Sequence, residues 1–166
     1  GVGAGGWGRC GGANGACAEV VSEEWGVGDR VVVAQGYDCA WLAREIRGRV
    51  PRTTIITFWH IPWRNPESFG ICPWRDELIA GLLGSTILGF HTRFHCQNFV
   101  ETVDRYLEAR IERESSTISY GGDLTRVEPY PISIQWPPEW ADDQMPVALC
   151  RAKVLRVENL PGDVPL

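Results

Sequence analysis

The hydrophobic positions of this chain follow two spacings. Short runs of β-branched and apolar residues have the composition of buried strands, and they lie at 30–35, 54–59 and 85–90. Elsewhere apolar residues recur three or four positions apart, which predicts helices at 38–49, 74–83 and 92–110. Strands that alternate with helices are typical of parallel strands joined by right-handed crossovers. We therefore expect an α/β fold with a mostly parallel sheet.

Two of these helices can be described further. Asp38 is a suitable N-cap for the helix at 38–49, because its carboxylate can accept hydrogen bonds from free backbone N–H groups. In the helix at 92–110 we expect the buried face to consist of Phe94, Phe99, Val103, Tyr106 and Leu107. The charged residues between 101 and 114 are then a solvated face with opposite charges one turn apart.

The two ends of the chain have different patterns. Residues 1–17 are rich in glycine, so we expect them to be disordered, with a weak helix following at 17–25. Their first letters match G-x-G-x-x-G, but no strand precedes them, so a dinucleotide site is not expected. Towards the other end we predict a β-hairpin at 116–120 and 124–127, a short strand at 131–136 and a helix at 147–155.

Composition narrows the function classes. At 166 residues the chain is long enough for one domain with a substantial core. Its net charge of −5 argues against a nucleic-acid partner, and it has no run of about 18 apolar residues for a membrane span. Six scattered cysteines without a C-x-x-C pair, and no secretory signal pattern, predict reduced thiols in the cytoplasm. The first residue is not methionine, and we expect both ends to be cut.

Histidines are the main candidates for chemistry. His91 and His95 are four positions apart, a spacing that can present two imidazoles to a metal, but no third ligand has a suitable place, so no metal is expected. His60 ends a buried strand and is followed by a proline turn, with tryptophans nearby whose rings suit the apolar face of a sugar. From the residues alone, a functional histidine and a satisfied core histidine both remain open.

A series of motifs carries a resemblance to a known family. They are HIPW at 60–63, NPESF at 65–69, PWRDELIAGLLG at 73–84, LGFHT at 88–92 and YPISI at 130–134. In this order and at these distances they resemble the trehalose-6-phosphate synthase family, which includes the glucosylglycerol-phosphate synthases. The resemblance covers about residues 28–136.

This resemblance implies a fold and an activity. Members are retaining glycosyltransferases of the GT-B type, with two facing Rossmann-like domains. They transfer glucose from a nucleotide sugar, commonly UDP-glucose, to glucose 6-phosphate, or to glycerol 3-phosphate in the other branch. The expected partners are therefore a nucleotide sugar and a sugar phosphate, with no cofactor and no metal. The oligomeric state is left open.

The resemblance also assigns site residues. His60 matches the histidine of the family's HIPxP motif, which lies beside the donor sugar, so we assign it to the catalytic site. The family's Asp-Tyr-His motif corresponds here to Gly36-Tyr37-Asp38, in which glycine replaces the sugar-contacting aspartate and aspartate replaces the histidine. We assign Tyr37, Asp38 and Trp63 to substrate binding. Arg64 stands where the family's second proline would follow.

The same comparison lowers the expected activity. Residues 18–166 correspond to part of the acceptor-side domain, with the β-hairpin as a small insertion, and the nucleotide-sugar domain is not expected in this chain. The family's phosphate-binding loop is not recognisable in residues 1–17. We therefore expect a fragment or degenerate copy that is inactive alone. A non-catalytic sugar-phosphate-binding module and a truncated gene product without a role of its own are the alternatives, so whether the chain is an enzyme stays open.

Overall fold

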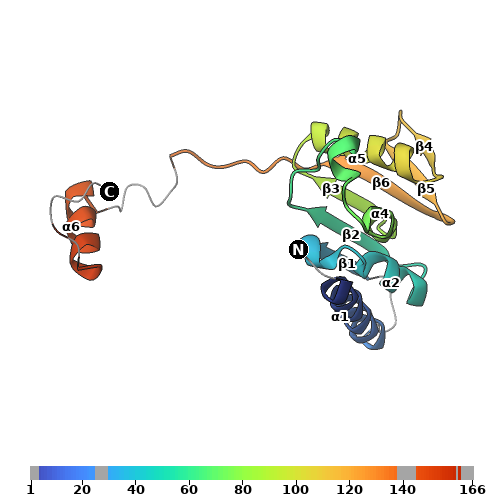
Figure 1. Ribbon diagram of the computed structural model, residues 1–166, viewed down its shortest axis with the longest axis horizontal. Coiled ribbons are helices and arrows are strands. Elements are labelled where there is room, and N and C mark those ends of the chain that lie inside the picture. The colour runs from blue at the N-terminus through green and yellow to red at the C-terminus, as the bar shows by residue number, and fades with distance from the viewer. Residues whose placement is uncertain (1–3, 25–29, 138–144, 160, 162–166) are drawn as a thin grey trace. The chain divides into compact units, whose positions relative to one another are not determined.

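The chain forms two separate units in the computed structural model, which describes residues 4–24, 30–137, 145–159 and 161. The first unit comprises residues 1–131 and the second comprises residues 132–166. All strands among the described residues belong to the first unit, which Figure 1 shows as a sheet with helices packed against it. The described part of the second unit contains one helix, α6 at Val147–Val157.

A six-stranded sheet in the order β1-β2-β3-β6-β5-β4 is the centre of the first unit. Four neighbouring strands are parallel: β1 (Val31–Gln35), β2 (Thr54–Trp59), β3 (Ile87–Phe90) and β6 (Asp123–Pro129). Two antiparallel strands extend the sheet beyond β6: β5 (Thr117–Tyr120) and β4 (Arg110–Glu112). The expected α/β fold with a mostly parallel sheet is confirmed.

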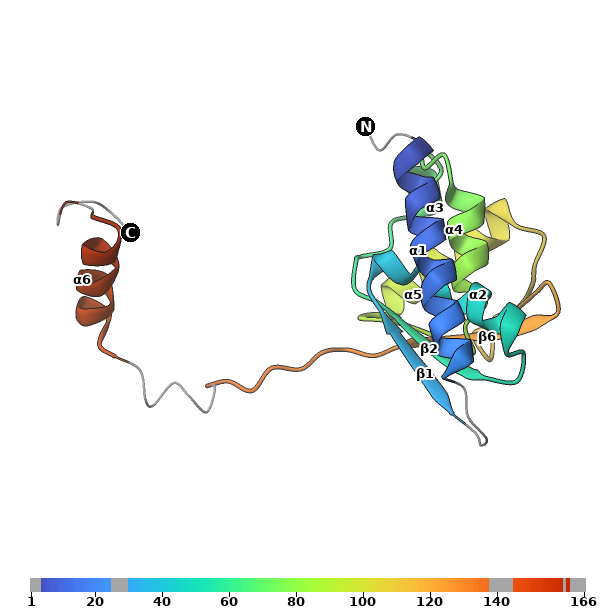
Figure 2. The ribbon, with the colours of Figure 1, turned by 90° about the horizontal axis from the view of Figure 1, so that it is seen from below.

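One helix, α1 (Ala4–Glu23), precedes β1. The other helices of this unit lie between the parallel strands: the 3-10 helix η1 (Tyr37–Cys39), α2 (Leu42–Arg49), α3 (Pro66–Phe69), α4 (Arg75–Leu82) and α5 (Arg93–Tyr106). In Figure 2 the helices α1, α2 and α4 lie in front of the strands. Within the described residues, no helix is long and apolar enough to cross a membrane.

The core lies between these helices and one face of the sheet. Thr57, Leu88 and Val127 are aligned across β2, β3 and β6, and all three are buried. On the same face, Leu88, Phe90 and Val127 pack in one cluster with the buried residues of α4 and α5, and Ile55 packs with α1 and α2 in a second cluster. Burial of this apolar surface is the main stabilising term of the fold.

The β-hairpin prediction is also confirmed. β5 pairs with β6, and the turn between them contains Gly121 and Gly122 with φ of 61° and 93°. Positive φ at both central positions gives a turn whose twist matches that of the flanking strands, and glycine adopts it without strain. Strand β4 was not predicted, because its residues fall in the charged run that was assigned to a helix.

The glycine-rich start differs most from the prediction. Residues 4–17 belong to helix α1 and are not irregular; residues 1–3 lie outside the described part. Small side chains let this helix pack closely on the fold: Ala18 is fully buried, and a Cβ on Gly11 would lie 3.2 Å from the Trp41 ring. Asn14 Nδ2 donates a hydrogen bond of 2.7 Å to the Asp38 carbonyl. Tertiary packing thus overrides the poor helix propensity of glycine.

Four further predictions are wrong. Asp38 lies in η1, and helix α2 starts after its N-cap Trp41. Helix α5 ends at Tyr106 instead of 110, because Leu107 turns to an extended conformation and leads into β4, and Phe94 is exposed. The predicted strand at 131–136 is not a strand: these residues pair with no strand among the described residues, and Ile134 and Trp136 are more than 80% exposed.

Candidate ligand site at the carboxyl edge of the sheet

The carboxyl ends of the four parallel strands meet at one edge of the sheet. In open α/β sheets, ligands bind at this edge. Here it carries Gly36 after β1, His60 after β2, His91 after β3 and Tyr130 after β6. Backbone hydrogen bonds hold the first residues beyond the strands, since Gly36 N donates to the Phe58 carbonyl at 3.3 Å and Tyr130 N to the Phe90 carbonyl at 2.7 Å. The edge is therefore a fixed part of the fold.

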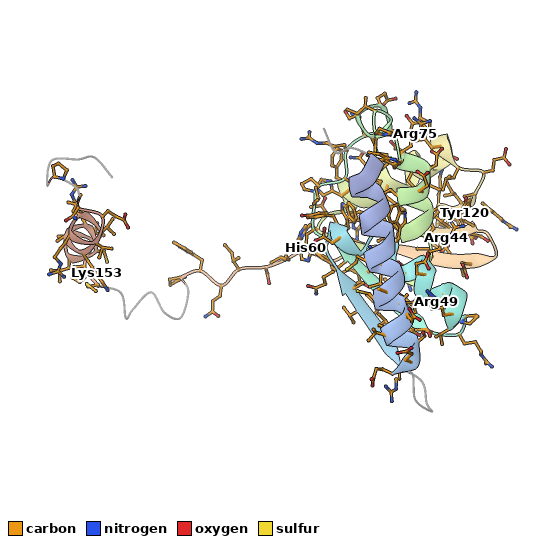
Figure 3. All side chains as sticks on the ribbon, turned by 60° about the horizontal axis from the view of Figure 1, so that its bottom comes forward. Arg44, Arg49, His60, Arg75, Tyr120 and Lys153 are labelled. Carbon is orange, nitrogen blue, oxygen red and sulfur yellow. The ribbon has the colours of Figure 1, made fainter. Side chains whose placement is uncertain are left out.

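Two histidines stand together over the ends of β2 and β3. The ring centroids of His60 and His91 are 5.7 Å apart, and each ring makes an edge-on contact with Phe58, at 4.8 and 4.9 Å. His60, which is labelled in Figure 3, is exposed, and His91 is half-buried. The sequence analysis considered His91 only with His95 and missed this pair. The sequence contained a signal for it, because His91 directly follows the strand β3 in the same way that His60 directly follows β2.

Gly89 allows aromatic rings to close over β3 at this edge. A Cβ at Gly89 would lie 2.7 Å from Tyr130 Cδ2 and 3.0 Å from Phe58 Cδ2, which is too close for a real side chain. Phe58 and Tyr130 therefore approach each other across this glycine. The edge combines two polar rings with apolar walls, as small-molecule sites do.

Trp63 does not lie at this edge, and its assignment to substrate binding is corrected. Its side chain is 2% exposed, stacks on Phe69 with centroids 4.4 Å apart, and donates through Nε1 to Thr102 Oγ1 at 3.0 Å. The Trp63 carbonyl accepts a hydrogen bond from Asn98 Nδ2 at 2.9 Å. A buried indole offers no face to a sugar. Trp63 fastens the end of the HIPW segment to helix α5.

Tyr37 and Asp38 lie at the end of β1 with exposed side chains, so both are accessible to a ligand. Gly36 precedes them with a φ of 94° and a ψ of 163°, and no atom lies within 4 Å of the place of its missing Cβ. This conformation is open to glycine and strained for other residues. The position that corresponds to the aspartate of the family's motif therefore has no side chain, and the space beside it is open.

The two histidines considered for a metal, His91 and His95, have different contacts. His91 contacts Phe58 and His60, whereas the His95 ring Nδ1 lies 3.3 Å from the Trp63 carbonyl. In the part of the chain that the structure describes, no three His, Cys, Asp or Glu residues are grouped to hold a metal ion. One cysteine has a distinct environment: burial raises the pKa of the Cys96 thiol to about 11.

Curated proteins with similar sequences include a validamine 7-phosphate valienyltransferase and trehalose-6-phosphate synthases. The validamine 7-phosphate valienyltransferase of Streptomyces hygroscopicus subsp. jinggangensis is 33% identical over 107 residues, which are 63% of this chain and 22% of that protein. The trehalose-6-phosphate synthase of Mycolicibacterium vanbaalenii is 34% identical over 110 residues, 62% of this chain and 22% of that protein. The matched region thus spans about a fifth of the length of these relatives.

Solved structures agree with the sequence matches. An E. coli structure described as trehalose-6-phosphate bound with UDP-2-fluoro glucose superimposes with a TM-score of 0.76 at 25% identity, over 93% of this chain and 34% of that one. The family model for glycosyltransferase family 20 matches residues 5–146. The resemblance to the trehalose-6-phosphate synthases is confirmed, and the chain belongs to glycosyltransferase family 20.

Proposed function

We propose that the carboxyl edge of the sheet binds the sugar of a sugar-phosphate or nucleotide-sugar ligand, as part of a trehalose-phosphate-type glucosyltransferase. The observation that carries the proposal is the position of His60, exposed at the end of β2 inside the family's HIPW motif. Its ring nitrogens can donate to or accept from sugar hydroxyls. Tyr37 and Asp38, exposed at the neighbouring strand end, would complete the contacts.

The proposed reaction is the transfer of glucose from UDP-glucose to glucose 6-phosphate. The bond between the glucose C1 and the diphosphate oxygen breaks, and the acceptor hydroxyl forms the new bond and releases its proton. The site of this chain would contribute positioning, because a correctly oriented acceptor removes much of the entropic barrier. The relatives named above support this substrate class. We also propose that the protein acts in the cytoplasm, since its scattered cysteines suit a reducing compartment.

We further propose that the chain is inactive by itself. The described residues form one sheet-containing unit and a separate helix, and they include no second α/β unit to face the carboxyl edge. A two-domain transferase needs groups from both sides of its cleft to hold the donor diphosphate. An assay for UDP release from UDP-glucose and glucose 6-phosphate should therefore give no signal above background, and clear turnover would overturn this part of the proposal.

Binding can be tested separately from turnover. Calorimetric titration with glucose 6-phosphate should show saturable heat, and His60→Ala should weaken binding about tenfold, as expected for the loss of one good hydrogen bond to a ligand. Phe94→Ala is a matched control, because Phe94 is an exposed ring of the same unit. Lack of binding by the unmodified chain, or unchanged binding after His60→Ala, would contradict the proposal.

Gly36 favours a second candidate, a non-catalytic module that binds sugar phosphates. The missing carboxylate at the end of β1 removes one sugar contact without closing the edge, since the space beside Gly36 is open.

Titration with glycerol 3-phosphate in parallel separates the two branches of the family. Preference for glycerol 3-phosphate over glucose 6-phosphate would support the glucosylglycerol-phosphate branch.

A further inference from the structure

The polar groups of the carboxyl edge are distributed unevenly over the strand ends. At the end of β1, Gly36 offers no side chain, whereas His60 and His91 stand next to each other over β2 and β3. Neighbouring strands are about 4.8 Å apart, so the choice of strand end decides where a ligand lies. The two neighbouring imidazoles therefore make the ends of β2 and β3 the place where a ligand can meet two side chains at once.

We propose that His91 is a second ligand-binding residue and that the sugar of the ligand lies across the ends of β2 and β3, between His60 and His91. The inference rests on the proposed function, because it places the ligand of that same site. The ligand class is a phosphorylated sugar. Two imidazoles can hold hydroxyls on neighbouring carbons of such a ring, one nitrogen to each.

The ring nitrogens of both histidines are available for this role. Among the described residues, neither His60 nor His91 has a hydrogen-bonding partner, and neither contributes a buried polar atom without one. A buried and unpaired ring nitrogen would cost free energy, and neither histidine has one, so these nitrogens are accessible to a ligand. His95 differs, because its Nδ1 already faces the Trp63 carbonyl at 3.3 Å.

The surrounding aromatic rings set the orientation of the pair. Phe58 meets both imidazoles edge-on at nearly equal distances, 4.8 and 4.9 Å. Phe58 itself is fixed against Gly89, where no Cβ intervenes, and Tyr130 lies on the other side of that glycine. The pair therefore stands on a rigid aromatic base, with the exposed ring of Tyr130 beside it as an apolar wall.

The three histidines of the chain allow a direct test by NMR. Their imidazole proton signals are assigned with single substitutions, and the full chain is titrated with glucose 6-phosphate. The signals of His60 and His91 should shift together along one binding curve, while that of His95 stays in place as the internal control. A shift of His60 without a shift of His91 overturns this inference and leaves the proposed function standing. If no ligand binds, both fail.

Two substitutions separate ligand contact from simple packing. His91→Gln keeps a hydrogen-bonding side chain and should weaken glucose 6-phosphate binding less than threefold. His91→Phe keeps a flat ring against Phe58 but removes the nitrogens, and it should weaken binding about tenfold. A packing role predicts the reverse order, with His91→Phe tolerated, and that order overturns the proposal. Thermal melts of both variants show that they are folded at the titration temperature.

Discussion

The two faces of the sheet are formed by the same strands, but helices cover one of them and leave residues of the other exposed. On one face Ile55, Leu88 and Phe90 are fully buried beneath helices. On the other, Val31 and Val33 are about 60% exposed, although they come from the same kind of β-branched run. Apolar composition therefore predicts the strands but does not determine which side is covered. That is decided by the connections between them.

The connections place their helices on the same side. Helix α2 links β1 to β2, α4 lies between β2 and β3, and α5 lies between β3 and β6, so the parallel strands follow one another in a single direction across the sheet. Right-handed crossovers that proceed in one direction put every helix on the same face. The residues of the opposite face accordingly belong to neither core cluster.

The largest expected difference between the faces comes from removing a large side chain. Phe90→Ala on the helix-covered face should destabilise the fold by about 3–5 kcal/mol, because it leaves a cavity among α5 and the sheet. Leu124→Ala, at a position 64% exposed on the other face, should cost less than about 0.5 kcal/mol. Urea unfolding of both variants measures the two losses of unfolding free energy. Equal losses would show that the two faces do not differ in packing.

A buried hydroxyl pair gives the next largest effect. Ser85 Oγ donates a hydrogen bond of 2.7 Å to Thr57 Oγ1, and both residues are fully buried. Thr57→Val leaves the Ser85 hydroxyl without this acceptor and should cost about 1–3 kcal/mol in unfolding free energy. The double variant Thr57→Val with Ser85→Ala should recover part of that loss, and no recovery would mean that the hydrogen bond is not the cause.

Cys96 provides a pH-dependent test of the covered face. Burial raises the pKa of its thiol from 9.0 to about 11, so above pH 9 the unfolded chain releases this proton more readily than the folded one. The contribution of this group to stability is complete below pH 9 and should fall as the pH rises towards 11. Thermal unfolding at pH 8, 9 and 10 should show a shallower decline in Cys96→Ala, and parallel declines would exclude Cys96 as the source.

The smallest effect should come from Val33, which can be compared with a buried valine, Val127. Val33 lies on the face without helices, the bare face, and Val33→Thr should change the unfolding free energy by no more than about 0.5 kcal/mol. Val127 is 1% exposed on the helix-covered face, and Val127→Thr should lower the unfolding free energy by about 1–3 kcal/mol. Chemical denaturation under identical conditions compares them. A large cost at Val33 would show that the bare face is covered in solution.

Much of this architecture could be predicted from local patterns. Both ends of β2 were predicted correctly, because its apolar run lies between Pro51 and Pro62, and proline disfavours a central strand. The turn at Gly121 and Gly122 was recognisable because few other residues adopt positive φ at both positions. The helical start was not, since Gly11 of α1 packs against Trp41, which lies in another segment, and no local pattern shows this contact.

The sequence predicted which strand end carries the candidate site, but it did not show which other residue lies beside it. His60 follows from its place at the end of β2, but its neighbour His91 comes from a different strand, and only the register between β2 and β3 brings the rings together. Trp63 was assigned wrongly for a similar reason. An indole after a strand end suggests a sugar-binding wall, and nothing local shows that Thr102 on α5 binds its Nε1.

Trp63 has a consequence for the thermodynamics of the binding that we propose at His60. The short segment from His60 to Trp63 is fixed at one end by β2 and at the other by the buried indole, with Asn98 holding its carbonyl. A ligand that meets such a segment does not have to order a loop first. The entropic cost of association is then limited to the ligand and a few exposed side chains, so modest contacts suffice for measurable affinity.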